Sequence, residues 1–323
     1  MTEGPSNPIL HRQIHPGVQF LILIGLLILM LMIGTGIGVV IIESKYGTAT
    51  LMDIMKLNLS VPHADTALWI LQFTGTTFPI LITPIIFSYF IVHEPDDYMK
   101  NHFHYPWMLM VLVFLIMAAA QVAIDYLGDI NAKMVLPKAL KGLEDWMKDS
   151  ENEAQKMSNV MMQMNTFWGM IYDLLFIGLL TAIVEEILFR GCMQTIFIRW
   201  WKNPHVAVWV TAILFSAFHM EFYGFLPRLF LGVLFGYFTV WSGSIWPAIW
   251  AHFINNGAIV VWEYLYQNKL TRVNPDAQQV FTNTAYAISF VITVILLFIY
   301  WYISDKWHKA HNGEELDQDL YVH

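Results

Sequence analysis

Residues 17–42 read GVQFLILIGLLILMLMIGTGIGVVII, a run of 26 positions without a single Asp, Glu, Lys or Arg. A helix needs about 20 apolar residues to cross the ~30 Å hydrocarbon core of a bilayer, so this run predicts a membrane-spanning helix. The run is too long for the apolar part of a signal peptide, and further spans follow it. We therefore expect it to stay in the mature protein as a permanent helix.

The rest of the chain repeats this character. The chain is 57% hydrophobic and 13% charged over 323 residues, a composition that a polar surface could not cover in water. Turn signals separate the apolar segments at Lys202-Asn203-Pro204, at Tyr223-Gly224 and at Ser242-Gly243-Ser244. The sequence thus predicts an all-α polytopic membrane protein of about eight transmembrane helices with an intramembrane polar active site. The further predicted spans are residues 67–92, 105–124, 166–200, 204–220, 225–241, 245–266 and 277–304.

We expect three segments along the chain. Residues 1–163 hold the first three spans and a connecting loop, residues 164–266 hold a core of four spans, and residues 267–323 hold the last span and an acidic tail. The loop, residues 127–163, carries Leu140, Leu143, Trp146 and Met147 at helical spacing among charged residues. This pattern predicts an amphipathic helix on the membrane surface, either as a plain connector or as a gate for substrate entry.

Charge and cysteine content exclude several classes of function. A net charge of −8 and the absence of clustered Lys and Arg argue against nucleic acid as a partner and leave the lipid bilayer as the expected one. Cys192 is the one cysteine, which excludes an internal disulfide and a multi-cysteine metal site. An even number of spans places both termini on one side, and a small excess of Lys and Arg favours the cytoplasmic side.

An acidic pair inside an apolar run is the first chemical signal. The segment AIVEEILFR places Glu185, Glu186 and Arg190 at membrane depth, where ionisable residues are costly and mark functional sites. Glu186 and Arg190 are four residues apart and can pair on one helix face. Glu185 points about 100° away, so it has no such partner and is the candidate general base. A purely structural Glu186–Arg190 pair would leave Glu185 unexplained.

Two histidines follow on later spans. If the turn after the fourth span is centred on Lys202, Glu185 precedes it by 17 residues and His219 follows it by 17, so an antiparallel hairpin brings the two to similar depth. His252 and Asn256 are four residues apart on one helix face, where both can donate hydrogen bonds to a developing oxyanion. The alternative for His252 and Asn256 is a pair that joins two helices.

Together these residues resemble the signature of the type II CAAX prenyl endopeptidase and bacteriocin-processing intramembrane protease family: Glu-Glu-x-x-x-Arg, Phe-x-x-x-His and His-x-x-x-Asn. The matching residues lie between positions 165 and 265. The resemblance implies a glutamate-dependent endopeptidase in which Glu185 and His219 activate water, His252 and Asn256 stabilise the oxyanion, and Glu186 and Arg190 support the site. It also implies membrane-associated peptide or protein substrates, some of them lipidated, and the cytoplasmic membrane as the location if the source is bacterial.

A cofactor is not expected, although members of this family are often labelled metalloproteases. If the reaction were metal-dependent, Glu185, His219 and His252 would be the ligands of Zn²⁺. Other intramembrane proteases lack their motifs here, since the chain has no His-Glu-x-x-His and no Gly-x-Ser-Gly on a helix. Two alternatives stay open: an ion- or proton-coupled transporter that uses the buried polar residues, and a non-catalytic immunity or scaffold member of the same family.

Overall fold

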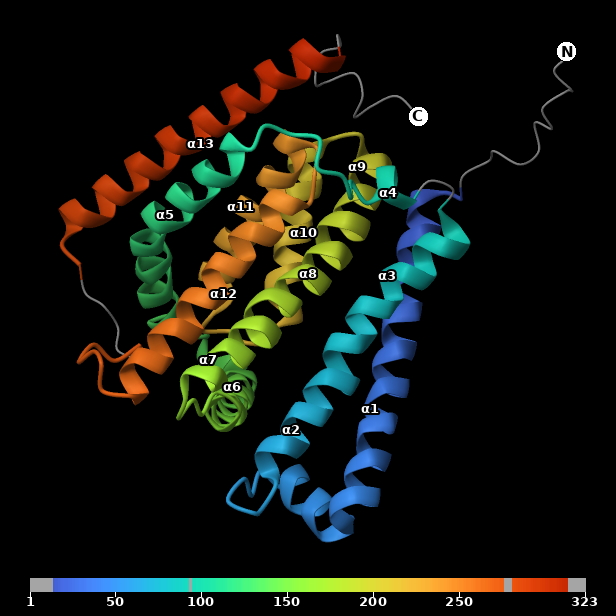
Figure 1. Ribbon diagram of the computed structural model, residues 1–323, viewed down its shortest axis with the longest axis vertical. Helices are drawn as coiled ribbons and strands as arrows, with labels where there is room; N and C mark the ends of the chain where they lie inside the picture. The colour runs from blue at the N-terminus through green and yellow to red at the C-terminus, as the bar shows by residue number, and fades with distance from the viewer. Residues whose placement is uncertain (1–13, 93–94, 276–280, 313–323) are drawn as a thin grey trace, which may run out of the picture.

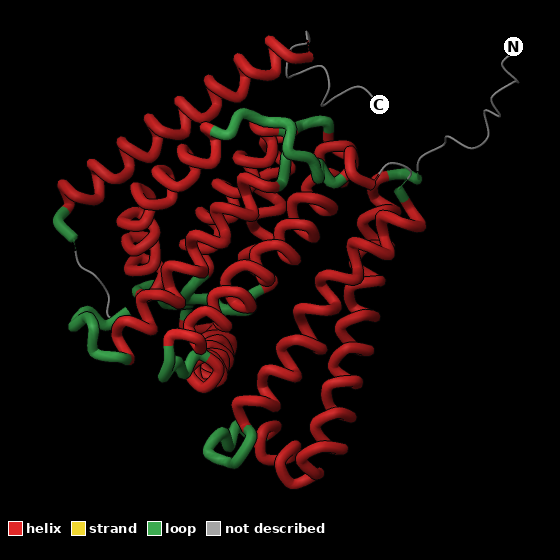
Figure 2. The backbone as a smooth tube through the Cα atoms, viewed as in Figure 1, coloured by secondary structure: helices red, strands yellow, loops and turns green. Residues whose placement is uncertain are grey.

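The computed structural model describes residues 14–92, 95–275 and 281–312, and these ranges contain helices and loops but no strand (Figures 1 and 2). The last predicted span begins at residues 277–280, which lie outside the described residues, as does the acidic tail. The α-helices are α1 (Pro16–Met55), α2 (Ala64–Gln72), α3 (Phe78–Ile91), α4 (Pro95–Tyr98), α5 (Met108–Ala132), α6 (Lys141–Met161), α7 (Phe167–Asp173), α8 (Thr181–Glu186), α9 (Thr195–Trp201), α10 (Pro204–Phe218), α11 (Phe225–Ser242), α12 (Trp246–Gln267) and α13 (Asn283–Asn312).

Six helical segments of the described chain are long and apolar enough to cross a membrane, so the chain is an all-α polytopic membrane protein. The remaining two predicted spans are helices as well, but α10 has only 15 residues and α12 falls short in hydropathy. The hydropathy of α12 is low because the polar residues His252, Asn255 and Asn256 all lie on this helix. Within the described residues, six of the eight predicted spans are thus both long and apolar enough to cross a membrane, and the other two are helical as well.

The long helices run up and down the molecule in turn (Figure 1). Helix α1 begins at the same end at which α13 finishes, as expected for an even number of passes. One hydrophobic core joins residues from distant parts of the chain, among them Leu23 of α1, Ile116 of α5, Val184 of α8 and Tyr300 of α13.

Helices α1 to α3 form a hairpin that stands beside the other helices (Figure 1). Helix α1 has 40 residues and is kinked at Gly47, whose φ of 83° and ψ of 162° are not helical, so it consists of two helical parts. Two glycines allow the two arms of the hairpin to touch, since a Cβ at Gly34 would collide with the Thr74 carbonyl oxygen and one at Gly38 with its hydroxyl.

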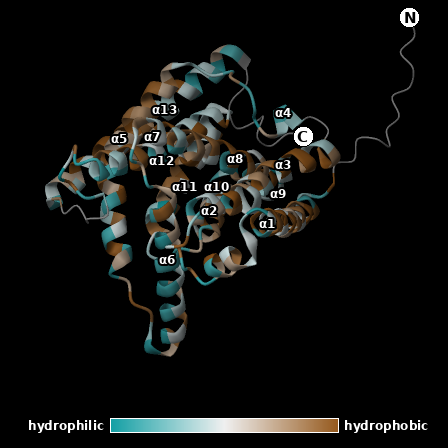
Figure 3. Cartoon of the chain, turned by 60° about the horizontal axis from the view of Figure 1, so that its bottom comes forward, coloured by the Kyte–Doolittle hydropathy of each residue, from teal (hydrophilic) through white to brown (hydrophobic). Residues whose placement is uncertain are grey.

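Helix α6 is the helix predicted in loop 127–163. Most helices lie along the plane of Figure 1, whereas α6 is seen nearly end-on, so it lies across one end of the bundle. In the turned view of Figure 3 it extends from the helices as a mostly hydrophilic rod. Leu143 and Trp146 are exposed while Glu144 is buried and pairs with Lys148. At the other end of α6, Met157, Val160 and Met161 pack against a buried cluster of α1 and α2.

Three segments are π-helical rather than α-helical: η1 (Phe73–Thr77), η3 (Leu174–Leu180) and η4 (Ile187–Gln194). The π-helix is rare and often occurs at functional sites, because its wider turn leaves side chains and carbonyl groups in positions that an α-helix does not offer. Segments η3 and η4 lie on either side of α8, the six residues that end in the acidic pair. The helical stretch Phe167–Trp201 is thus irregular on both sides of Glu185 and Glu186.

Candidate active site

A buried ion pair forms the rigid base of the site. Nη1 of Arg190 lies 2.7 Å from Oε1 of Glu186, and both side chains are completely buried, which confirms the pairing predicted from their spacing. Nη2 of Arg190 also donates to the carbonyl oxygen of Gly232, 3.0 Å away on α11. The guanidinium lies over the ring of Phe215, 4.5 Å from its centroid, an arrangement that adds cation–π attraction in an apolar setting.

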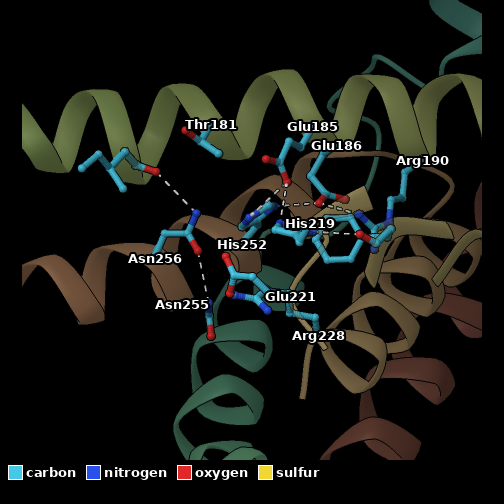
Figure 4. Close-up of polar contacts among 12 residues, drawn as sticks. Thr181, Glu185, Glu186, Arg190, His219, Glu221, Arg228, His252, Asn255 and Asn256 are labelled. Atoms are coloured by element: carbon cyan, nitrogen blue, oxygen red, sulfur yellow. Dashed lines mark hydrogen bonds and ion pairs between the residues drawn. The ribbon is translucent and has the colours of Figure 1, made fainter. Parts of the chain in front are cut away.

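The same carboxylate orients His252. Nδ1 of His252 lies 2.8 Å from Oε1 of Glu186, and because a carboxylate only accepts, the proton of this bond is on Nδ1. The imidazole ring stacks on Phe235 and meets Phe215 edge-on, so it has little room to turn. Glu186 therefore holds Arg190 and His252 at one oxygen and directs Nε2 of His252 away from itself (Figure 4).

Glu185 faces both histidines. Its Oε2 lies 3.8 Å from Nε2 of His219 and 3.9 Å from Nε2 of His252. These distances are too long for direct hydrogen bonds but suit a bridging water molecule. Oε2 is buried and has no hydrogen-bond partner within the described chain. Nδ1 of His219 donates to the carbonyl oxygen of Phe215 at 2.8 Å, which leaves Nε2 as an acceptor turned towards Glu185.

Asn256 lies one turn further along α12 and lines the same cavity. Its Nδ2 donates to the carbonyl oxygen of Ile177 at 3.4 Å, and its Oδ1 accepts from Nδ2 of Asn255 at 3.1 Å. Ile177 belongs to η3, so the amide is held by a carbonyl of a π-helical segment. No hydrogen bond joins Asn256 to Glu185, His219 or His252 in the described ranges, and its second N–H hydrogen is left for other partners.

A cavity of about 920 Å³ opens in front of these residues. One wall comes from α8, α11, α12 and the loop after α10, and the other from α1, α2 and η1; residues of α6, α7 and η3 complete the lining. Within the part of the chain that the structure describes, no group of three or more His, Cys, Asp or Glu side chains has the arrangement of a metal site. The lining of the cavity includes Glu185, His219, His252 and Asn256 together with Leu68, Trp69, Phe176, Leu180 and Ile259.

Sequence reasoning missed two charged residues of this cavity. Arg228 forms an ion pair with Glu221, and both line the cavity beside His219. The signal was present, since Arg228 is the only Asp, Glu, Lys or Arg in the predicted span 225–241 and a charge at membrane depth is a functional candidate.

The loop between α10 and α11, which directly follows His219, is held from two neighbouring helices. On α5, Nδ2 of Asn131 donates to the carbonyl oxygen of Phe222 at 2.8 Å and Oδ1 accepts from the backbone N–H of Leu226 at 2.6 Å. On α6, a carboxylate oxygen of Glu151 accepts from the backbone N–H of Tyr223 at 3.1 Å. Burial raises the pKa of Glu151. Helix α6 is thus tied to the loop that carries a site histidine.

Fold and site together define a polytopic α-helical membrane protein with a Glu–His–His arrangement beside a cavity that is lined by its helices. The family model "Type II CAAX prenyl endopeptidase Rce1-like" matches residues 167–258, the segment that supplies all six predicted site residues. Over this segment the chain is similar to the CAAX prenyl endopeptidase family of intramembrane proteases.

The chain is also similar to the uncharacterized protein YpbD of Bacillus subtilis (strain 168). The two are 31% identical over 88 residues, which cover 26% of this chain and 42% of YpbD. The match thus spans less than half of that relative. No solved structure matches the chain.

Proposed function

We propose that the protein is an intramembrane endopeptidase that hydrolyses peptide bonds of membrane-associated proteins. One observation carries this proposal: Glu185 Oε2 lies 3.8 and 3.9 Å from the Nε2 atoms of His219 and His252, at the wall of a cavity large enough for a peptide segment. A water molecule held there would donate its two protons to Glu185 and to His219, and its free lone pair would face the cavity.

The chemistry then follows general acid–base catalysis. Glu185 takes a proton from the water while the water oxygen attacks the scissile carbonyl carbon, and the carbonyl oxygen becomes an oxyanion. When the carbon–nitrogen bond breaks, the protonated Glu185 returns a proton to the leaving amine. His219, held through Nδ1 by the Phe215 carbonyl, keeps the water in line.

His252 and Asn256 are the proposed oxyanion donors. A proton on Nε2 of His252 makes the ring an imidazolium, and the Glu186 carboxylate at Nδ1 stabilises that charge. Asn256 contributes the N–H hydrogen that Ile177 does not use.

The substrate class follows from the cavity. Its apolar lining and its position in the membrane suit a peptide that is itself membrane-associated, with or without a lipid anchor. In a bacterium the cytoplasmic membrane is the proposed location.

The test uses the purified full chain in detergent with a panel of internally quenched decapeptides, each carrying a palmitoyl or a farnesyl group. We expect Glu185→Gln to lower kcat at least 10²-fold, the scale of general acid–base catalysis. Glu43→Gln, on the exposed part of α1, is the matched control and should leave kcat unchanged. Full cleavage by Glu185→Gln would overturn the proposal, and solute flux that depends on Glu185 without any cleavage would point to a transporter.

A chelator arm tests the metal-free mechanism. We expect cleavage to persist in excess EDTA, since the scheme above uses side chains alone. If EDTA abolishes cleavage and Zn²⁺ restores it, Glu185, His219 and His252 are the residues that would hold the ion.

A further inference from the structure

The wall of the cavity that faces the acidic pair comes from the α1–α3 hairpin and carries polar side chains that the reaction scheme does not use. Gln72, the last residue of α2, and Thr76, in η1, line the cavity with Thr35 of α1. This hairpin is otherwise apolar, and polar side chains in a membrane helix normally bond to a neighbouring helix or to a backbone carbonyl.

These side chains lack such partners. In the described chain neither the Gln72 nor the Thr76 side chain takes part in a hydrogen bond, whereas nearby threonines bond back to their own helix: Thr74 Oγ donates to the Ile70 carbonyl and Thr83 Oγ to the Pro79 carbonyl, each at 2.7 Å. The difference follows position, because Thr74 and Thr83 do not line the cavity. Of these four side chains, the two without a hydrogen-bond partner are the two that line the cavity.

The helical segments that carry the two side chains pack against the opposite wall of the cavity. The π-helical segment η1 begins directly after Gln72 and contains Thr76, one turn later on the same side of the helix. Trp69 of α2 packs edge-on against Tyr172 and Phe176, with ring centroids 5.2 and 6.1 Å apart, and so joins the hairpin to the opposite wall. The wall that carries Gln72 and Thr76, here called the polar wall, is thus part of the packed structure.

We propose that Gln72 and Thr76 bind the backbone of an extended substrate segment during cleavage, an inference that rests on the proposed function and deepens it. A peptide that enters the cavity loses water from its N–H and C=O groups, each of which needs a new partner. An amide and a hydroxyl both donate and accept, so they match either backbone group. No charged side chain lies on this wall among the lining residues, which favours recognition of backbone over recognition of a charged side chain.

Kinetics of palmitoylated decapeptide cleavage test the proposal. Gln72→Leu and Thr76→Val should each raise KM about fivefold, the loss of one net hydrogen bond, and change kcat less than twofold. The matched controls are Gln121→Leu, whose amide bonds to Asp125 outside the cavity, and Thr74→Val; both should keep the wild-type KM. Gln72→Asn, which keeps the amide but shortens its reach, should lie between wild type and Gln72→Leu.

A second arm isolates the backbone contact. The same decapeptide is N-methylated at one backbone position after another, and its Kd is measured on the Glu185→Gln variant. At one position we expect methylation to weaken binding about fivefold, and to have no effect once Gln72→Leu is added, because the two changes remove the same bond. Equal losses with and without Gln72→Leu at every position would overturn the inference. So would a lower kcat with unchanged KM, which would show that the wall only hydrates the site.

Failure of the inference is distinct from failure of the proposed function. Full cleavage by Glu185→Gln sinks the proposed function itself. An inactive Glu185→Gln variant combined with a wild-type KM for Gln72→Leu and Thr76→Val sinks only the role of the polar wall.

Discussion

Removing Arg190 should destabilise the protein far more than removing Arg190 and the Glu186 charge together. Arg190→Met leaves the completely buried Glu186 carboxylate without its cation, and breaking a buried pair in this way costs ~3–5 kcal/mol. Glu186→Gln alone leaves the Arg190 guanidinium uncompensated and should cost a similar amount.

The double variant Arg190→Met/Glu186→Gln removes both charges at nearly constant volume. The amide oxygen of Gln can still accept from Nδ1 of His252, and the Met thioether packs against the rings of Phe215 and Phe235. What is lost is the hydrogen bond to the Gly232 carbonyl and the cation–π contact, ~1–2 kcal/mol in all. The coupling between the two sites should therefore exceed ~4 kcal/mol.

Reversible unfolding in mixed micelles with increasing SDS, followed by circular dichroism, gives the three free energies of unfolding. A double variant that loses the sum of the two single losses would refute the reasoning, because it would mean that the two charges do not compensate each other. The activity of the double variant is a separate readout. It should remain low, since the imidazolium of His252 loses the carboxylate that stabilises it.

Three further outcomes are expected. His252→Gln should lower kcat ~10²- to 10³-fold in the decapeptide assay with little change in KM, and a kcat within twofold of wild type would exclude His252 from oxyanion stabilisation. Gly34→Val should lower the unfolding temperature by opening the contact with Thr74, at a cost of ~1–3 kcal/mol, whereas Gly36→Val, where a Cβ meets nothing, should not. Lys100→Met should raise the unfolding temperature at pH 7, because burial lowers the pKa of Lys100 to about 8 and the folded protein holds a desolvated ammonium below that pH. The gain in unfolding temperature should shrink as the pH rises from 8 towards 10.5. In this range Lys100 of the wild type is neutral in the folded protein but still protonated in the unfolded chain, so the wild type becomes more stable as the pH rises. A gain in unfolding temperature that does not depend on pH would contradict this explanation.

Local spacing was sufficient for part of the site. The pairing of Glu186 with Arg190 follows from their four-residue separation, and it holds even though Arg190 lies in the π-helical segment η4. The symmetric placement of Glu185 and His219 around Lys202 likewise brought them to one depth, as the 3.8 Å distance shows. Their catalytic roles stay predictions.

Contacts between distant segments could not be read from the sequence. Glu186 and His252 are 66 residues apart, and nothing in their local patterns says that they share a hydrogen bond. The polar wall was missed for a related reason: Gln72 and Thr76 look unremarkable in an apolar run until the hairpin is placed against α8 and the missing partners become visible. The short α10 and the polar α12 show why a span count based on apolar runs exceeds the six spans that meet both criteria.

The π-helical segment η3 makes the length of its helix as important as its composition. A π turn closes over one more residue than an α turn, so deleting one residue from 174–180 would let the segment revert to α-helix while Tyr172, which precedes it, keeps its direction relative to Glu185. Deleting one residue from the regular helix α8 would instead rotate everything before it by ~100° relative to the acidic pair, and Tyr172 and Phe176, which meet Trp69, would then face elsewhere. The helix that carries the acidic pair therefore tolerates the loss of one residue at η3 but not in α8, a restriction that a count of hydrophobic residues would never reveal.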